Sequence, residues 1–427
     1  MEIKFKDHLS LGVSTAATQI EGGECEHNWY DWYTKGNIKD HSNPAHATNH
    51  YHLWKEDTLL MSEMKIKHYR MGIEWARICP KESEVDLEVI AHYKVELQYL
   101  KEQGITVLLT IHHFTNPMWF ERKGAFTKKE NIKYFLDFVE LIVKEFGSLV
   151  SEYITINEPN VYATNSYYFG EWPPGEKSFS NTILVMSNMA ICHIKAYQMI
   201  HSIREFMGYQ DTLVSFANHV RVFDPLNPKN PWHFICAKLL DWFFQGAITN
   251  AISRGKFRWP LKRTKDITPG EYLDFIAINY YTRSTVSGFC DGVKQNAPKN
   301  DLGWEIYPEG LIRCADHIYR LLKRPIYITE NGTCDNKDAF RSKYIYEHLK
   351  VINEANLPIT RYYHWCFCDN FEWVEGESAR FGLVHINFNT QERTIKTSGE
   401  FYTKMIEENG ISNELYREYV ESQKYHY

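Results

Sequence analysis

Short apolar runs alternate with longer amphipathic stretches along the whole chain. The runs are rich in aliphatic, β-branched and aromatic side chains, and most of them contain no polar alternation. Continuous apolar runs are typical of parallel strands that are buried on both faces. The expected strands span residues 11–16, 68–75, 105–113, 153–157, 212–218, 274–281, 325–329 and 359–367.

Between the runs, apolar residues recur with the spacing of a helix. In residues 86–104 they fall at positions 87, 90, 93, 97 and 100, and Gly104 is suited to the C-terminal cap. The expected helices span residues 54–66, 86–104, 128–147, 180–207, 235–254, 308–322, 338–355 and 398–409. Eight alternating strands and helices predict an α/β fold, a closed (β/α)8 TIM barrel, with an open doubly wound sheet as the alternative. Because no linker or low-complexity tract interrupts the pattern, we expect residues 1–427 to form a single domain.

Composition narrows the class of partner. The 427 residues are 44% hydrophobic and carry a net charge of −6, which argues against nucleic acid as a partner. Aromatic residues make up 15% of the chain. This content indicates either a large aromatic core or a cleft that stacks rings against a sugar.

Location and metal binding are predicted from what the sequence lacks. The first residues contain no apolar signal-peptide core, no long apolar window spans a membrane, and the nine Cys form no CxxC pair. We therefore expect a cytoplasmic protein with reduced thiols, no membrane partner, no metal site and no cofactor. The adjacent His112 and His113 do not change this, because neighbouring strand residues point to opposite faces. The pattern does not predict an oligomeric state.

Two glutamates stand where expected strands end. Glu158 follows the fourth strand in TINEP, and Glu330 follows the seventh strand in ITENG. Active sites of such barrels lie at the C-terminal ends of the strands, and two facing carboxylates are the minimum needed to break a glycosidic bond. The alternative is that each is a solvated or ion-paired loop residue.

These two segments resemble the catalytic signatures of glycoside hydrolase family 1, the retaining β-glycosidases. The likeness extends over nearly the whole chain, in the order that the family shows. It includes TAATQIEGG (15–23), HYRMGIEWARICP (68–80), TIHHFTNPMWF (110–120), INEPNVYA (156–163), GEWPPG (170–175), FIAINYYTR (275–283), GWEIYPEGL (303–311) and DNFEWVEGESARFGLV (369–384).

The resemblance implies the roles of the catalytic residues. Glu330 matches the nucleophile and Glu158 the general acid/base. Arg70 and Tyr281 match the groups that hold Glu330 ionised by lowering its pKa, and Asn279 matches a residue that orients the acid/base. The charge of Glu330 should raise the pKa of Glu158 until glycosylation removes it. Retention of configuration follows if the carboxyl groups lie about 5–5.5 Å apart.

The resemblance also implies a pocket for one sugar ring. The matching hydroxyl-binding positions are Gln19, His113, Asn157, Glu372 and Trp373, with Trp365 as the platform beneath the ring. Asn157 is expected at the 2-hydroxyl, whereas Gln19 and Glu372 share the 4-hydroxyl. Tyr167 and Trp304 are expected on the aglycone side.

The substrate is left open by departures from the common family pattern. Many members have Tyr-His-Trp where this chain has His112-His113-Phe114, and Ser where it has Glu74. The combination of EWARI (74–78), HHFTNP (112–117) and NEPNVYA (157–163) with the WPPG turn (172–175) resembles more closely the branch that contains archaeal glycosidases, whose glycone preferences are mixed. The expected partner is therefore a small carbohydrate or β-glycoside that ends in a non-reducing β-D-glucosyl, galactosyl or fucosyl residue.

Two alternatives have specific signatures. Family members that cleave 6-phosphoglycosides hold the phosphate with Ser, Lys and Tyr, where this chain has Trp373, Ala379 and Phe381, and Glu372 would repel a phosphate. Catalytically silent sugar-binding members lack a catalytic glutamate, whereas this chain has both Glu158 and Glu330.

Overall fold

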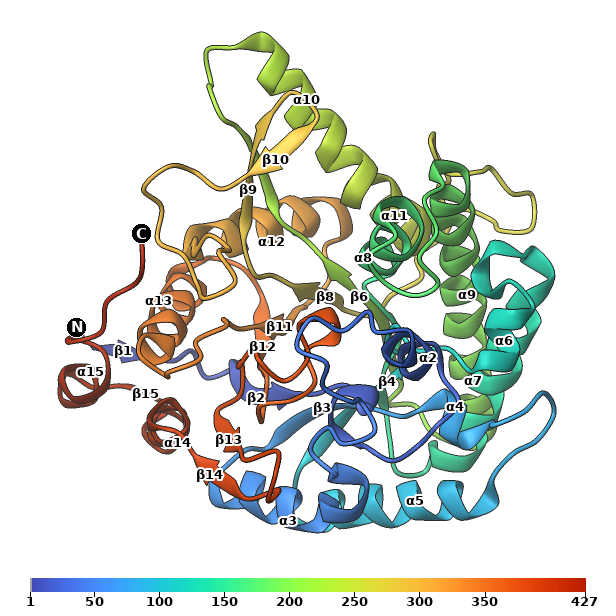
Figure 1. The fold of residues 1–427 in the computed structure, drawn as a ribbon, viewed down its shortest axis with the longest axis horizontal. Helices are drawn as coiled ribbons and strands as arrows, with labels where there is room; N and C mark the ends of the chain where they lie inside the picture. Colours follow the sequence, from blue (N-terminus) through green and yellow to red (C-terminus); the bar gives the residue numbers. More distant parts are fainter. Residues whose placement is uncertain (1) are drawn as a thin grey trace.

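The computed structural model describes residues 2–427 and is built around eight parallel strands that close into a barrel (Figure 1). Each strand overlaps one of the expected apolar runs, so the predicted (β/α)8 barrel is confirmed. The strands are β2 (Ser10–Ser14), β3 (His68–Gly72), β4 (Thr106–His112), β5 (Glu152–Asn157), β6 (Leu213–His219), β8 (Ile276–Asn279), β11 (Ile326–Asn331) and β12 (Ile359–Trp365). Pairing of β12 with β2 completes the ring.

Helices surround the barrel at the places where helical spacing predicts them. The longer helices are α3 (His50–Glu63), α5 (Leu87–Glu102), α7 (Ile132–Phe146), α9 (Phe179–Phe206), α12 (Pro308–Leu322), α13 (Arg341–Glu354) and α14 (Thr397–Glu408). The helix expected over 235–254 is interrupted: α10 (Pro231–Asp241) and α11 (Ala247–Arg254) are joined by the π-helical turn η4 (Trp242–Gly246). The side chain of Asp86 caps α5 by accepting from the backbone N–H groups of Glu88 and Val89.

Shorter elements fill the connections between strands and helices. The helical ones are α1 (Ala17–Ile20), α2 (Asn28–Thr34), α4 (Trp75–Ile78), α6 (Met118–Arg122), η1 (Ala125–Thr127), η2 (Lys129–Asn131), α8 (Pro159–Ala163), η3 (Thr164–Phe169), η5 (Trp373–Glu375) and α15 (Asn413–Tyr419). The remaining strands are β1 (Ile3–Lys4), β7 (Val222–Pro225), β9 (Arg283–Ser287), β10 (Cys290–Gly292), β13 (Val384–Ile386), β14 (Arg393–Ile395) and β15 (Gly410–Ile411). β1 pairs with β15, which joins the two ends of the described chain.

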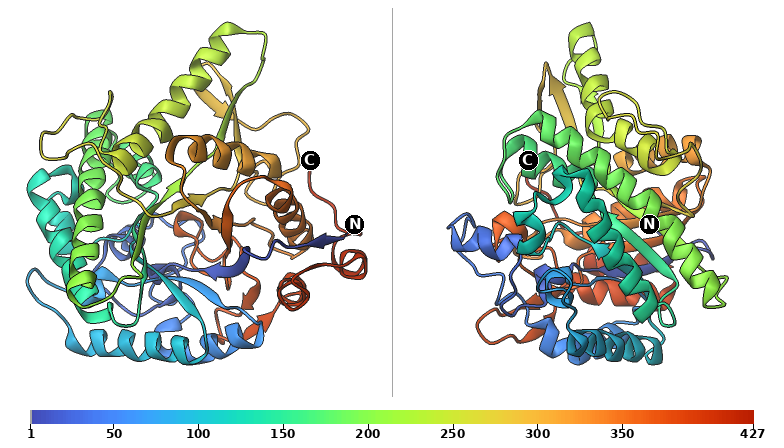
Figure 2. Two further views of the ribbon diagram at one scale, coloured as in Figure 1. Left: turned by 180° about the vertical axis from the view of Figure 1, so that it is seen from behind. Right: turned by 90° about the vertical axis from the view of Figure 1, so that its right-hand side faces the viewer.

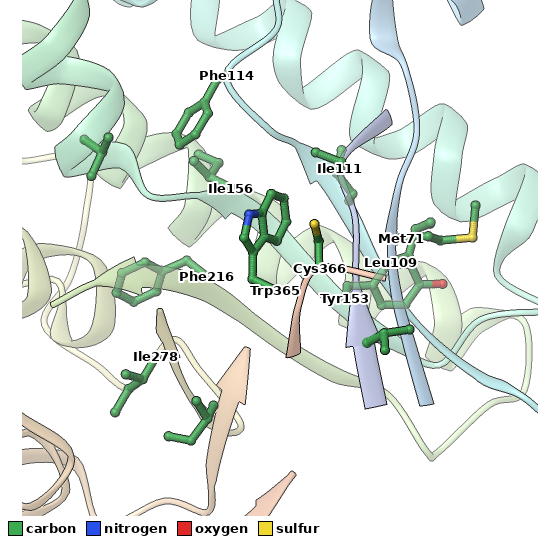
Figure 3. Packing of buried hydrophobic residues seen from close by; sticks show 14 of the residues in the cluster. Met71, Leu109, Ile111, Phe114, Tyr153, Ile156, Phe216, Ile278, Trp365 and Cys366 are labelled. Carbon is green, nitrogen blue, oxygen red and sulfur yellow. The ribbon is translucent and has the colours of Figure 1, made fainter. Parts of the chain in front are cut away.

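Adjacent strand residues enter different parts of the core. Leu108 and Ile154 belong to a small cluster that also contains Tyr327 and Tyr363, all from barrel strands. Their neighbours Leu109 and Tyr153 belong instead to the large cluster shared with the helices. Figure 3 shows part of the large cluster around the indole of Trp365. This division follows from the alternation of side chains along a strand, and it explains why the runs lack polar alternation.

The helix α9 is long and apolar enough, by length and composition alone, to cross a membrane. Its most apolar window has a mean hydropathy of 1.2, but 72% of that window is buried inside the protein. Such burial is typical of a core helix in a soluble protein, and α9 packs against α7 and α11.

One part of the structure extends beyond the barrel and its helices. β7 follows the C-terminal end of β6 and β9 follows that of β8, and the two pair in parallel in a small sheet with β10. Helix α10 packs against this sheet, and Figures 1 and 2 show the assembly projecting from the rest of the molecule. We call the end formed by residues 226–235 and 288–294 the projecting tip.

Candidate active site

Glu158 and Glu330 both lie at the C-terminal ends of barrel strands. Glu158 follows β5 and caps α8 with a left-handed backbone (φ 42°), while Glu330 belongs to the last residues of β11. Both strands have register irregularities immediately before these positions, between Ile154 and Asn157 and between Ile328 and Glu330. Such irregularities redirect side chains at the rims of barrels. The two glutamates are only 5% and 3% exposed.

Glu330 is held by one cation and one hydroxyl. Arg70 donates through Nη1 to Oε1, and the Tyr281 hydroxyl donates to Oε2 at 2.6 Å. Burial raises the pKa of Glu330 to about 7; Arg70 and Tyr281 lower this pKa and the charge of Glu158 raises it. The expected lowering of the pKa by Arg70 and Tyr281 is therefore present, but the effect of burial is larger.

Arg70 lies in the barrel interior and is fully buried. Its Nη2 donates to Asn157 Oδ1 at 2.6 Å, and its Nε donates to Thr110 Oγ1 at 3.1 Å. Nη1 also donates to the backbone carbonyl of Thr329. The guanidinium thus joins β3 to β4, β5 and β11, and its direction is fixed from several sides.

Asn279 connects this cluster to Glu158. Its Nδ2 donates to Glu158 Oε1 at 2.8 Å and to Asn157 Oδ1 at 3.0 Å, while its Oδ1 accepts from Thr329 Oγ1 at 2.7 Å. A continuous path of hydrogen bonds therefore runs from Glu330 through Arg70, Asn157 and Asn279 to Glu158. The structure brings together all five residues that the sequence predicts as catalytic.

His219 also contacts Glu158, and the sequence did not single it out. Its Nδ1 lies 3.1 Å from Glu158 Oε1, and its Nε2 lies 3.2 Å from Arg221 Nη2. Because a guanidinium can only donate, Nε2 must accept and Nδ1 must carry the proton that is donated to Glu158. Burial lowers the pKa of His219, which favours this neutral ring. Its position at the end of β6 is the signal that could have identified it.

The two oxygens of Glu158 differ. Oε1 accepts from both Asn279 and His219. Across residues 2–427, no protein group donates to Oε2. His219 also stacks on the ring of Tyr281, with centroids 5.9 Å apart and planes inclined by 21°. The supports of the two carboxylates are therefore in contact with each other, and one oxygen of Glu158 is left for a ligand.

Gln19 and Glu372 form a second polar group beside the pair. Gln19 Nε2 donates to Glu372 Oε2 and to Asn370 Oδ1, each at 3.1 Å, while Gln19 Oε1 is buried without a partner in the described chain. Burial raises the pKa of Glu372 to about 8, and hydrogen bonds from Gln19 and Trp365 oppose this rise. A buried polar atom without a partner is a position where a ligand can bond.

The predicted aromatic lining is assembled around His113. Its ring is stacked against Trp365 and against Trp373, with both centroid distances 5.8 Å. Asn157 uses its oxygen for Arg70 and Asn279, so its Nδ2 donates to His113 Nε2 at 2.9 Å. Burial lowers the pKa of His113 well below its usual value, so the ring is neutral.

The two residues expected on the aglycone side have different surroundings. Trp304 is 36% exposed and packs edge-on against Tyr281, with ring centroids 5.9 Å apart. Tyr167 is 1% exposed and packs against Tyr162. Trp304 thus contacts a partner of Glu330, whereas the ring contact of Tyr167 is with Tyr162.

The three residues at the phosphate-binding positions of the 6-phosphoglycosidases are apolar here. Trp373, Ala379 and Phe381 are buried, and the neighbouring Arg380 bonds Asp369 and the Ile386 carbonyl. Within residues 2–427, no three His, Cys, Asp or Glu side chains are grouped as a metal ion requires.

Comparison with known proteins identifies the family. Residues 1–411 match the model of glycosyl hydrolase family 1. β-Glucosidase A of Acetivibrio thermocellus is 30% identical, covering 96% of this chain and 100% of that protein. The structure resembles a β-glycosidase from Pyrococcus horikoshii with a TM-score of 0.90 and 30% identity, covering 99% of this chain and 100% of the other.

A second solved structure carries a sugar-like inhibitor. The β-glucosidase from Thermotoga maritima in complex with deoxynojirimycin has a TM-score of 0.85 and 28% identity, and the match covers 96% of this chain and 100% of that one. These matches extend over the barrel and over both strand ends that carry the glutamates. The chain therefore belongs to glycosyl hydrolase family 1 and is a glycoside hydrolase of the β-glucosidase type.

Proposed function

We propose that this enzyme is a retaining β-glycosidase that removes a terminal non-reducing β-D-glucosyl residue, or a galactosyl or fucosyl residue in its place, by double displacement. Glu330 is the nucleophile and Glu158 the general acid/base. The observation that carries the proposal is the path of hydrogen bonds from Glu330 through Arg70 to Glu158. It gives two buried carboxylates different partners: a cation and a phenol for one, and neutral donors for the other.

In the first step, Glu330 attacks the anomeric carbon while the bond to the leaving oxygen breaks. Glu158 gives its proton to that oxygen, and we assign the proton to Oε2 because Oε1 already accepts two hydrogen bonds. The products are the free aglycone, a covalent glycosyl-enzyme and an ionised Glu158.

In the second step, water attacks the same carbon from the face that the aglycone left. Glu158 removes a proton from this water, and the bond to Glu330 breaks with its electrons returning to the carboxylate. Two inversions restore the original configuration. Arg70 and Tyr281 stabilise the charge that returns to Glu330.

The glycone pocket is proposed on the same basis. The unpartnered Gln19 Oε1 and the adjoining Glu372 offer acceptors to one sugar hydroxyl, and Trp365 offers a flat apolar face. Asn157 lies beside both Glu158 and Arg70, where a bond to the 2-hydroxyl can strengthen as charge develops. Trp304 flanks Tyr281 on the exposed side and is proposed to contact the aglycone.

Glu330→Gly tests the nucleophile. Hydrolysis of p-nitrophenyl β-glucoside should fall by roughly 10⁴-fold or more, because no covalent intermediate can form. Azide should restore turnover from the vacated face and yield an α-glycosyl azide, identified by NMR. Unchanged hydrolysis without azide would remove Glu330 from the mechanism.

Glu158→Ala tests the general acid. The value of kcat/KM should fall by roughly 10²–10⁴-fold for alkyl glycosides, whose leaving oxygen needs a proton, but far less for dinitrophenyl glycosides. Azide should here yield the β-glycosyl azide, because Glu330 still forms the intermediate. An equal loss on both classes of substrate would contradict the acid role.

Tyr281→Phe tests the pKa of the nucleophile. Glu330 must be ionised to attack, so kcat/KM should decline as the pH falls through about 7, the pKa to which burial raises this carboxyl. The Tyr281 hydrogen bond lowers that pKa, so its loss should move the acid limb of the profile to higher pH. Tyr280→Phe, whose hydroxyl donates to the Tyr307 carbonyl instead, is the matched control and should leave the limb in place. An unmoved limb in Tyr281→Phe would refute the assignment.

His219→Ala tests the support of the acid/base. The His219 hydrogen bond stabilises the carboxylate that forms when Glu158 gives up its proton. Loss of this hydrogen bond should lower kcat/KM for alkyl glycosides roughly 10-fold or more and spare dinitrophenyl glycosides. His219→Asn should recover most of this loss, because its amide N–H can stand where Nδ1 stands. His219→Gln places its amide near Nε2 and should not. Equal effects of the Asn and Gln variants would leave His219 a merely structural residue.

A further inference from the structure

The projecting tip is built as an extension of the strands that end at the active site. β7 begins three residues after His219, and β9 begins two residues after Tyr281. The two strands run parallel away from the barrel, and α10 returns from their far end. Figures 1 and 2 show this end standing clear of the other helices in every view.

Large apolar side chains are exposed at this tip. Each is between 37% and 66% exposed, and the Trp232 and Phe289 rings contact edge-on with centroids 5.7 Å apart. Large exposed apolar side chains that gather at one end of a molecule usually mark an interaction site. The residues are Leu226, Trp232, Phe234, Ile235, Phe289 and Val293.

Helix α10 exposes its large apolar side chains, whereas an ordinary surface helix buries them. The residues it buries against the small sheet are Cys236 and Ala237, which pack on Val286. Its largest apolar side chains, including Trp232 and Phe234, instead face solvent. Packing within this chain therefore does not account for the exposed aromatic residues of α10.

The projecting tip carries two lysines and one acidic residue, Asp291, and a third lysine, Lys238, follows it on α10. Lys229, Lys238 and Lys294 are exposed and form no ion pair within the described chain. The acidic residues of the same strands are neutralised, because Asp224 bonds Arg283 and Arg313 and Asp291 lies near Arg221. The charges that lack an ion-pair partner here are therefore positive, on a chain whose net charge is −6.

Aromatic and aliphatic side chains that are accompanied by lysines, such as Phe234 with Lys238, fit the interface of an anionic bilayer. At such an interface, aromatic rings lie in the headgroup region of the bilayer. The aliphatic part of a lysine side chain lies along the apolar surface, while its ammonium group binds lipid phosphates. A second copy fits less well, because a symmetric contact through this patch would bring the lysines of both copies together. The negative remainder of the chain would be repelled from such a membrane, which leaves the tip as the point of contact.

We propose that the projecting tip docks this enzyme peripherally on an anionic phospholipid surface. This differs from the expectation of no membrane partner, which was based only on the lack of spanning segments. The docking is independent of turnover, because the tip shares no residue with the two glutamates or the glycone pocket.

The test is co-sedimentation of the full chain with vesicles of phosphatidylcholine alone or mixed with phosphatidylserine. The wild type should bind the mixed vesicles, bind phosphatidylcholine much less, and be released at high ionic strength. The triple variant Lys229→Gln, Lys238→Gln, Lys294→Gln should bind the mixed vesicles roughly 100-fold more weakly. The double variant Trp232→Ser, Phe289→Ser should also lose at least about 10-fold.

Phe206→Ser is the matched control, since Phe206 is 93% exposed at the C-terminal end of α9, away from the tip. It should bind as the wild type does, and circular dichroism should show that every variant is folded. If the double variant does not fold, Phe289→Ser alone takes its place, because this residue lies in the hairpin turn and is 66% exposed. Absence of wild-type binding, equal binding to neutral vesicles, or a dimer that Trp232→Ser abolishes would overturn the proposal.

Discussion

The buried guanidinium of Arg70 is the interaction on which the site depends. A charge removed from water is tolerated only when it is paired and its donors are satisfied, and Arg70 meets this condition with a carboxylate, an amide, a hydroxyl and a carbonyl. These partners come from three different strands, so the guanidinium fixes their relative positions as well as the charge of Glu330. A lysine in its place would supply the charge but not the planar array of donors.

The sequence was sufficient to predict the barrel because its strands are buried on both faces. Runs such as residues 105–113 and 153–157 contain little polar alternation, and the helices between them keep their spacing. The catalytic pair was equally visible, because Glu158 and Glu330 each end such a run. The register irregularities in β5 and β11 and the left-handed backbone of Glu158 were not visible, because they depend on contacts between neighbouring strands.

The parts that the sequence did not predict depend on contacts between distant residues or on burial. His219 is separated from Glu158 by 61 positions, and its tautomer is set by Arg221. Tyr167 lies in η3 and is buried, whereas the two residues after it, Tyr168 and Phe169, are half exposed. The sequence pattern alone does not show which of these neighbouring aromatic residues is buried. Burial raises the pKa of Glu330, and the identity of its charged partners does not reveal how deeply the carboxyl is buried.

Arg221 joins the active site to the projecting sheet. Its Nη2 donates to His219, while its Nη1 donates to Ser284 of β9 and lies 3.7 Å from Asp291 of β10. Burial lowers the pKa of this guanidinium, yet Asp291 and Glu158 oppose that effect, so it remains a donor. The group that fixes the proton of His219 on Nδ1 is thus also the group that anchors the base of the projecting sheet. One cation therefore contacts both the residue that supports Glu158 and the sheet that carries the tip.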